Sequence, residues 1–244
     1  MIDWFQALAA EKALPPGAAT QLQDRGYVVL PGAVPPDRRE RLSNSYTATV
    51  ESATGEDIRI GSTSTRVTDF VNRGPEYDDL YVFPPLLEAC SLVIGGPFKL
   101  SSLQARTLRP GALAQGLHVD VDRRSPDWPL LGFILMVDEF RPDNGATRFV
   151  PGSHKRADLP ADSLSEARVA EADQVAACGA AGSLLIFNGS TWHGHGTNTS
   201  STPRRSLQGA YIARDGRAGT DFASRMHPAT RARLSPLAHY LLAL

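Results

Sequence analysis

The sequence predicts a mainly β fold with flanking helices, in which the strands form an antiparallel barrel or jelly roll. From Phe98 onward, short apolar segments alternate with turn residues such as Pro110-Gly111 and Asn144-Gly145, which is typical of this architecture. Helical patterns are confined to the two ends, and 244 residues without an internal repeat fit a single domain. We therefore expect one domain in three parts: a helical N-terminal part at about 1–97, a β core at about 98–215 and a helical tail at 216–244.

In the N-terminal part, helix stops and starts are marked by glycine and proline. Gly26 follows one helical segment, and Pro35-Pro36 opens another in which Leu42, Tyr46 and Val50 recur at four-residue spacing. Residues 55–80 are mostly polar and predict a long irregular loop, which in a compact domain is usually functional. The predicted elements are helices at 18–25, from 36 onward and at 84–94, and a strand at 27–30.

The central part predicts strands, and the tail returns to helix. Turn residues, mainly glycine, proline and asparagine, separate the apolar segments. The predicted strands are 98–108, 116–121, 130–139, 146–150, 174–178, 183–187, 191–195 and 205–213, and the tail helices are 228–233 and 236–244.

Composition excludes several classes of function. The 25 basic and 26 acidic residues give a net charge of −1, so no overall field attracts nucleic acid or an anionic membrane. No apolar run approaches the roughly 20 residues that span a bilayer, and the first residues lack a secretory pattern. The two cysteines, Cys90 and Cys178, support neither a disulfide framework nor a thiolate zinc site. We therefore expect a cytoplasmic protein without nucleic acid, membrane or obligate protein partner.

Three residues could bind a metal ion. If 116–121 is a strand, His118 and Asp120 point to the same face, although a surface strand with two polar residues would show the same pattern. His193, in the predicted strand 191–195, would add a second imidazole. Two histidines and one carboxylate can occupy one face of an octahedral ion and leave three positions open, as in non-haem Fe(II) oxygenases. Catalytic zinc is the alternative.

Arg204 and Ser206 could bind a carboxylate. They lie two residues apart at the start of the last predicted strand, so the guanidinium and the hydroxyl would share a face. This pair suits one end of a dicarboxylate. The alternative is that Arg204 or Arg205 is simply exposed on the strand, as most arginines are.

The order of these motifs resembles the phytanoyl-CoA dioxygenase family of Fe(II)/2-oxoglutarate-dependent dioxygenases. The resemblance covers roughly residues 20–215 and includes the segment Asp24 to Leu30, which is similar to the first strand of the family. The motifs that carry it are, in order, His118-x-Asp120, the apolar strand 130–139, Asp143-Asn144-Gly145-Ala146-Thr147, Pro151-Gly152-Ser153-His154, His193-Gly-x-Gly-x-Asn198 and Pro203-Arg204.

The resemblance implies a double-stranded β-helix, that is, a jelly roll, with Fe(II), 2-oxoglutarate and O2 as cofactor and cosubstrates. The implied reaction hydroxylates an unactivated C–H of a metabolite and releases succinate and CO2. Asp120 favours hydroxylation, desaturation or a related oxidation over halogenation, because related halogenases have a small residue at that position. The implied iron ligands are His118, Asp120 and His193, and the implied 2-oxoglutarate contacts are Arg204, Ser206, Gln104 and Thr147.

Three further residues are candidates for the substrate side of the site. His195 stands where the family usually has serine, and on a strand it would share the face of His193. Arg66 lies in the polar segment 55–80, a predicted lid, and solvated loop charges are the alternative. Trp128 could line the pocket or pack in the core.

Two other functions remain open at this point. A cupin-like enzyme would use zinc or manganese without 2-oxoglutarate, with His195 as a fourth ligand, and would retain its activity in the Arg204→Ala variant. A catalytically silent barrel used for binding or sensing would hold the metal but never produce succinate.

Overall fold

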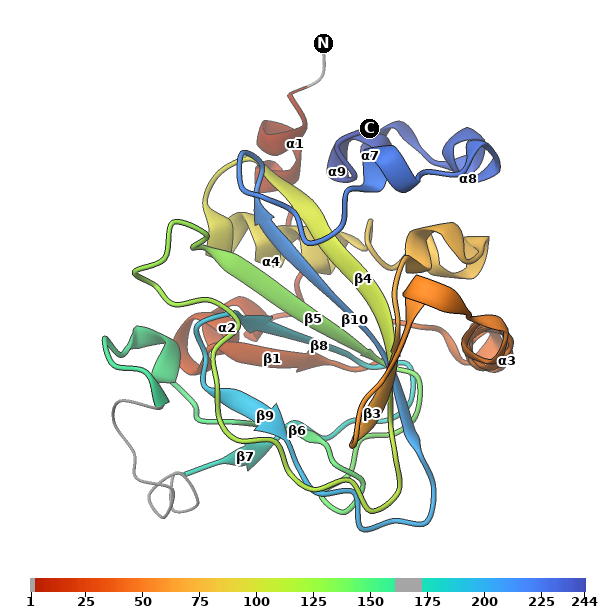
Figure 1. The fold of residues 1–244 in the computed structure, drawn as a ribbon. Coiled ribbons are helices and arrows are strands. Elements are labelled where there is room, and N and C mark those ends of the chain that lie inside the picture. Colours follow the sequence, from red (N-terminus) through yellow and green to blue (C-terminus); the bar gives the residue numbers. More distant parts are fainter. Residues whose placement is uncertain (1–2, 161–172) are drawn as a thin grey trace.

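Two β-sheets face each other in the computed structural model, which describes residues 3–160 and 173–244 (Figure 1). The larger sheet has seven strands in the order β1-β8-β5-β10-β4-β3-β2, and the smaller has the order β7-β6-β9. All the strand pairs are antiparallel. The strands are β1 (Tyr27–Leu30), β2 (Ile58–Ile60), β3 (Ser64–Val67), β4 (Phe98–Leu108), β5 (Leu130–Met136), β6 (Thr147–Phe149), β7 (Val175–Ala176), β8 (Leu184–Asn188), β9 (His193–His195) and β10 (Arg204–Ala213).

Local sequence explains where several helices begin and end. The Asp3 side chain accepts a hydrogen bond from the Gln6 N–H at the start of the first helix. Gly26 ends the second helix with a φ of 83°, a left-handed conformation that glycine adopts without strain. The α-helices are α1 (Trp4–Ala10), α2 (Ala18–Arg25), α3 (Pro36–Ser52), α4 (Pro84–Ile94), α7 (Phe222–Arg225), α8 (Pro228–Arg233) and α9 (Pro236–Leu241). None of the helices in the described ranges is long and apolar enough to cross a membrane.

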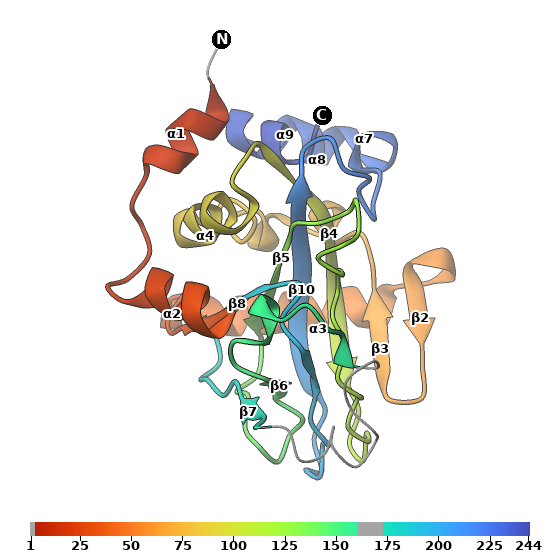
Figure 2. The same ribbon diagram turned by 90° about the vertical axis from the view of Figure 1, so that its left-hand side faces the viewer.

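The helices cover the outer face of the large sheet and the end of its longest strands. Leu86 of α4 and Tyr46 of α3 belong to one apolar cluster with Leu103, Leu135 and Leu207 of the sheet. Figure 2 shows α7, α8 and α9 grouped near the ends of β4 and β10, beside α1. This arrangement leaves the inner face of the large sheet free to face the small one.

The central strands follow one another as in a jelly roll, as the sequence predicted. From β4 to β10 the chain crosses repeatedly between the large and the small sheet, with β6 and β7 consecutive in the small one. A short bridge between His118 and His193 stands for a further strand of the small sheet. A second apolar cluster, which includes Ile134, Phe149 and Phe187, fills part of the space between the sheets. The metal-ligand candidates therefore lie on the inner surface of the roll.

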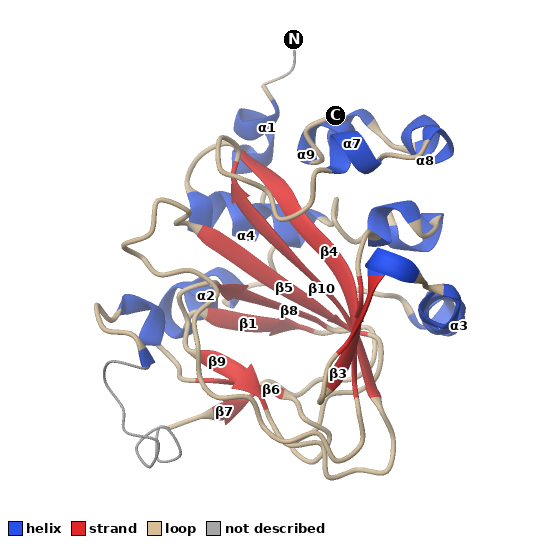
Figure 3. Cartoon of the chain, in the orientation of Figure 1, coloured by secondary structure: helices blue, strands red, loops and turns tan. Residues whose placement is uncertain are grey.

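The strand predicted at 116–121 is wrong, because the bridge at His118 is its single pairing (Figure 3). The N–H groups of Asp120 and Val121 both donate to the carbonyl of Gly189, so they cannot continue a ladder. Alternating polar residues do not form a strand here, because the backbone after His118 no longer runs alongside β9.

The loop predicted at 55–80 is also wrong in part. β2 and β3 lie in this segment and extend the large sheet, and 3-10 turns occupy Gly55–Asp57, Phe70–Asn72 and Pro75–Tyr77. β2 pairs with β3, and β3 pairs with the edge of β4, where Arg66 is opposite Arg106. Because that partner lies some 40 residues away, the local polar sequence does not reveal the strand.

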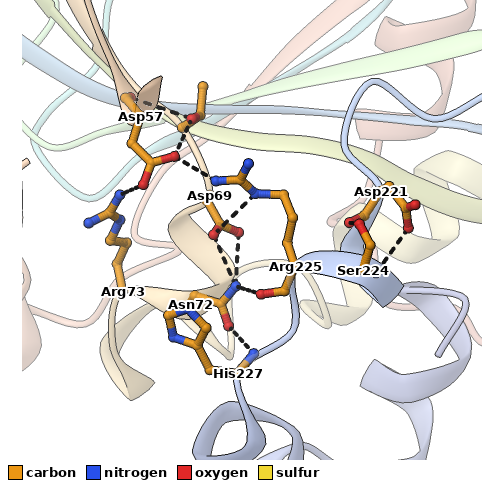
Figure 4. A network of polar contacts seen from close by, with 9 residues as sticks. Asp57, Asp69, Asn72, Arg73, Asp221, Ser224, Arg225 and His227 are labelled. Atoms are coloured by element: carbon orange, nitrogen blue, oxygen red, sulfur yellow. Dashed lines mark hydrogen bonds and ion pairs between the residues drawn. The ribbon is translucent and has the colours of Figure 1, made fainter. Parts of the chain in front are cut away.

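A network of charged side chains ties this hairpin to the C-terminal tail (Figure 4). Arg225 of α7 binds Asp57 before β2 at 2.6 Å and Asp69 after β3 at 3.4 Å. Arg73 also binds Asp57, and Asn72 donates to both oxygens of Asp69. Both ends of the hairpin that carries Arg66 are thus held by α7.

Candidate active site

His118, Asp120 and His193 form one cluster of potential metal ligands. Their ligand atoms lie within 4.8 Å of one another. Asp120 Oδ1 is 3.9 Å from His118 Nε2 and 3.6 Å from His193 Nε2. Two imidazoles and a carboxylate at these separations are suited to one face of an octahedral ion.

Backbone carbonyls orient both imidazoles. Nδ1 of His193 lies 2.8 Å from the Thr191 carbonyl, and Nδ1 of His118 lies 3.2 Å from the Gly116 carbonyl. A ring whose Nδ1–H donates to a carbonyl presents the lone pair of Nε2, so both Nε2 atoms are available to a metal. Burial lowers the pKa of His193, although Asp120 opposes this effect, so its imidazole is held in the neutral form that binds metals.

Gly194 allows the loop that carries His118 to approach β9. A Cβ at Gly194 would lie 2.9 Å from the carbonyl oxygens of Gln115 and Gly116, closer than a methyl group can pack. This contact brings the backbones of His118 and His193 into a pair of hydrogen bonds of 3.0 and 2.9 Å. The glycine after the metal histidine therefore has a structural function in forming the cluster.

A cavity of about 330 Å³ lies between this cluster and the large sheet. On the sheet wall of the cavity, paired residues of β4 and β10 form successive rows across the strands. Arg106 and Ser206 form one row, and Gln104 and Gln208 form the next. The polar residues that line the cavity are Arg66, Ser101, Ser102, Gln104, Arg106, Gln115, His118, Asp120, Thr147, His193, His195 and Gln208.

Arg204 lies one row deeper and is 1% exposed. Its guanidinium stacks on the Phe140 ring at 4.0 Å, and it donates to the Gly145 carbonyl. Its Nε and Nη2 are buried and have no hydrogen-bond partner among the described residues. Burial, followed by the charge of Arg106, lowers the pKa of Arg204 to about 9, so it is still a cation at neutral pH. A buried guanidinium with two free donors matches a carboxylate, and Ser206 on the same face of β10 is fully buried.

Arg106 is a site residue that the sequence analysis missed. It is 9% exposed, and its Nε has no partner in the ranges that the structure describes. Burial first, and Arg66 second, lower its pKa to about 10, whereas Asp120 acts in the opposite direction. The sequence carried a signal, because Arg106 follows Gln104 by two residues on one predicted strand and so shares its face.

The other predicted residues fall into two groups. Gln104, Thr147 and His195 line the cavity, as does Arg66, which is exposed at its margin. Trp128 lies in a separate outer cavity and is half-buried.

Two glutamines were also missed. Gln115 lies three residues before His118 in irregular backbone, for which no periodicity predicts a direction. Gln208 continues the alternation of Arg204 and Ser206 on β10 and could have been found from it.

His195 is buried beside the cluster, and it is not among the ligand group found in the described residues. Its Nδ1 lies 3.0 Å from the Gly196 carbonyl. Burial, with Arg106, Arg204 and Arg148 nearby, lowers its pKa to about 4. His195 therefore presents a neutral imidazole to the cavity.

Sequence comparison identifies the family. The model of the phytanoyl-CoA dioxygenase (PhyH) family matches residues 22–206. Dioxygenase trt7 of Aspergillus terreus is 30% identical over 93% of this chain and 83% of its own length. Multifunctional dioxygenase ausE of Emericella nidulans is 29% identical over 79% of this chain and 71% of its own.

Solved structures share the fold. EctD from S. alaskensis matches with a TM-score of 0.71 and 20% identity over 84% of this chain and 79% of its own. SnoK, described as a non-heme alpha-ketoglutarate-dependent carbocyclase from nogalamycin biosynthesis, matches with a TM-score of 0.69 and 22% identity over 88% and 92%. The chain therefore belongs to the phytanoyl-CoA dioxygenase family of iron- and 2-oxoglutarate-dependent dioxygenases.

Proposed function

We propose that this dioxygenase hydroxylates an unactivated C–H bond of a small-molecule metabolite, with release of succinate and CO2. The observation that carries the proposal is the pairing of a His-Asp-His cluster with a buried arginine, Arg204, whose Nε and Nη2 lack partners among the described residues. A binding module without chemistry would not need to keep an unpaired guanidinium buried, since this costs stability.

In this proposal, His118, Asp120 and His193 hold Fe(II) on one face. The three remaining positions would take 2-oxoglutarate and O2. When bound, the iron and 2-oxoglutarate supply the oxidising chemistry, while the protein orients the reactants and excludes water. The retained carboxylate of Asp120 favours hydroxylation over halogenation.

Arg204 and Ser206 would bind the carboxylate of 2-oxoglutarate that is far from the metal. Arg106 lies one row nearer the cluster and would face the second carboxylate. Two buried guanidinium groups thus match the two negative charges of the cosubstrate. Gln104 and Thr147, which line the same cavity, are further candidate contacts of cosubstrate or substrate.

The fold supports a single functional domain for residues 1–244. Helices of both ends pack on the sheet that forms one wall of the cavity, and α7 holds the hairpin that carries Arg66. We therefore include the terminal parts in the catalytic unit.

An anaerobic titration tests the proposal. Fe(II) and then 2-oxoglutarate are added to metal-free protein, and visible absorption is followed. We expect a charge-transfer band that requires both additions and is lost in His193→Ala. Succinate release with a panel of metabolites then tests turnover.

A different result would select another function. Binding of Fe(II) without a band after 2-oxoglutarate would favour the cupin-like enzyme. A band without succinate release for any metabolite would favour the silent barrel.

A further inference from the structure

The cavity wall above the metal cluster carries a neutral pair of amides. Gln104 of β4 and Gln208 of β10 are directly opposite each other in the register. Both are half-buried, and neither side chain has a hydrogen-bond partner in residues 3–160 or 173–244. Each carboxamide can donate and accept, so the pair is suited to a carbonyl or hydroxyl group of a ligand.

Beside the glutamines, on the neighbouring strands β5 and β8 of the same sheet, the cavity wall is apolar. Leu130, Ile134 and Phe187 line it. Gly132 leaves room for the Phe187 ring, because a Cβ there would lie 2.2 Å from Cζ of that ring. The sheet wall of this chamber therefore offers a ligand hydrogen-bonding groups beside an apolar surface.

The buried positive charges near the chamber are neutralised by the cosubstrate in the proposed function. The proposed function assigns Arg204 and Arg106 to the two carboxylates of 2-oxoglutarate. Ser102 and Ala210, in the row beyond the glutamines, are uncharged. The remaining cation, Arg66, is exposed at the margin. The reacting part of the substrate therefore meets an uncharged surface.

A larger cavity of about 740 Å³ adjoins the chamber. The two share Ser101, Asp120 and Leu130 in their linings. The inner 330 Å³ must also hold the metal and 2-oxoglutarate, so a bulky substrate would extend outward past Leu130.

The outer cavity favours an apolar and uncharged ligand over an anionic one. Trp128 and Ile212 give it apolar surface, and Asp127 and Asp215 contribute carboxylates. Arg217 is the one cation in its described lining. Surplus carboxylates repel the phosphates of an acyl-CoA thioester.

We propose that the substrate is a bulky, uncharged metabolite that places a carbonyl or hydroxyl group against Gln104 and Gln208 and extends into the outer cavity against Trp128. This inference rests on the proposed function, since it assigns a substrate class to the same site. It excludes free amino acids, which are small and charged, and acyl-CoA thioesters.

Binding of neutral polycyclic probes tests the inference. Testosterone and progesterone, uncharged and with ketone or hydroxyl groups, are compared with L-proline and palmitoyl-CoA. Quenching of tryptophan fluorescence is measured in metal-free protein and, anaerobically, in protein loaded with Fe(II) and 2-oxoglutarate. We expect at least one steroid to bind the loaded protein at least about tenfold more tightly than the other two classes.

Variants then locate the bound probe. The double variant Gln104→Leu/Gln208→Leu should weaken steroid binding about tenfold, since it removes two ligand hydrogen bonds. Gln23→Leu, on the exposed face of α2, is the matched control and should change nothing. Trp128→Phe should remove most of the quenching, whereas Trp4→Phe should not.

The inference is overturned if no steroid binds, if proline or the thioester binds more tightly, or if the glutamine variant binds like wild type. Failure of the proposed function has a different signature. In that case the charge-transfer band is absent, whatever the fluorescence of the metal-free protein shows.

Discussion

The two sheets that enclose the site differ in how firmly they fix their side chains. β4 and β10 of the large sheet have 11 and 10 residues and pair along their length. β6, β7 and β9 of the small sheet have two or three residues each. The pairing of β4 with β10 therefore fixes the backbone positions of Arg106, Arg204, Gln104 and Gln208 without any ligand.

The metal side relies on close packing instead of a ladder. His118 joins the small sheet by one bridge, which depends on the absence of a side chain at Gly194. We expect bound metal to stabilise this side more than the large sheet, because the ligands converge only there.

Arg204→Met should separate cosubstrate affinity from folding. Loss of one partner of a buried charged pair costs about 2–5 kcal/mol, so the KM for 2-oxoglutarate should rise at least about 30-fold. The thermal midpoint without 2-oxoglutarate should stay the same or rise, because an unpaired buried charge is removed.

Arg205→Met is the matched control, because Arg205 is half-buried and pairs with Asp138 at 2.7 Å. It should lower the midpoint and leave the KM unchanged. Equal KM values in the two variants would contradict the assignment of Arg204.

Gly194→Ala should disrupt the metal side. The new methyl group meets two backbone oxygens at 2.9 Å, and relief of such a clash costs about 1–3 kcal/mol. Iron affinity should fall about tenfold in a competition titration, while the large sheet is unaffected.

Gly116→Ala is the control, since a Cβ there has no atom within 4 Å. If both variants bind iron like wild type, the close approach of the His118 loop to Gly194 is not needed to form the metal site.

His195 should make the metal-free protein less stable in acid. Burial lowers its pKa to about 4, whereas an unfolded histidine titrates near 6.5. The unfolded state therefore binds the proton first, so this contribution is full above about pH 6.5 and is lost as pH falls towards 4.

The measurement is urea unfolding of metal-free protein at pH 7 and pH 4.5. His195→Gln should reduce the stability lost between these values by about 2 kcal/mol. The exposed His227→Gln should follow wild type. A parallel loss in all three proteins would show that folded His195 takes up its proton at the same pH as in the unfolded chain, and would contradict the lowered pKa.

Arg225→Gln should have the smallest effect, because its ion pairs are partly exposed. The free energy of unfolding should fall by about 1 kcal/mol or less, and the difference should shrink in 1 M salt. Arg141→Gln, whose pairs are more exposed, is the control and should change less. An equal loss in both would mean that the link between α7 and the hairpin adds nothing to stability.

The alternation of strands and turns, and with it the jelly roll, could be predicted from the local sequence pattern. This pattern also placed Gln104 on the strand before His118 and paired Arg204 with Ser206, because strand alternation is a local property. The spacing of His118, Asp120 and His193 was sufficient to propose a metal site, although the strand expected around His118 does not form.

Only the tertiary structure decided which distant residues share the cavity. Arg106 meets Ser206 and Arg66 through the register of three strands. β3 forms because it pairs with the edge of β4, and β2 then pairs with β3. Trp128 lines the outer cavity because it lies in an irregular loop, whose path the sequence does not indicate. Such contacts depend on backbone pairing over long sequence separations, which no local pattern of side chains encodes.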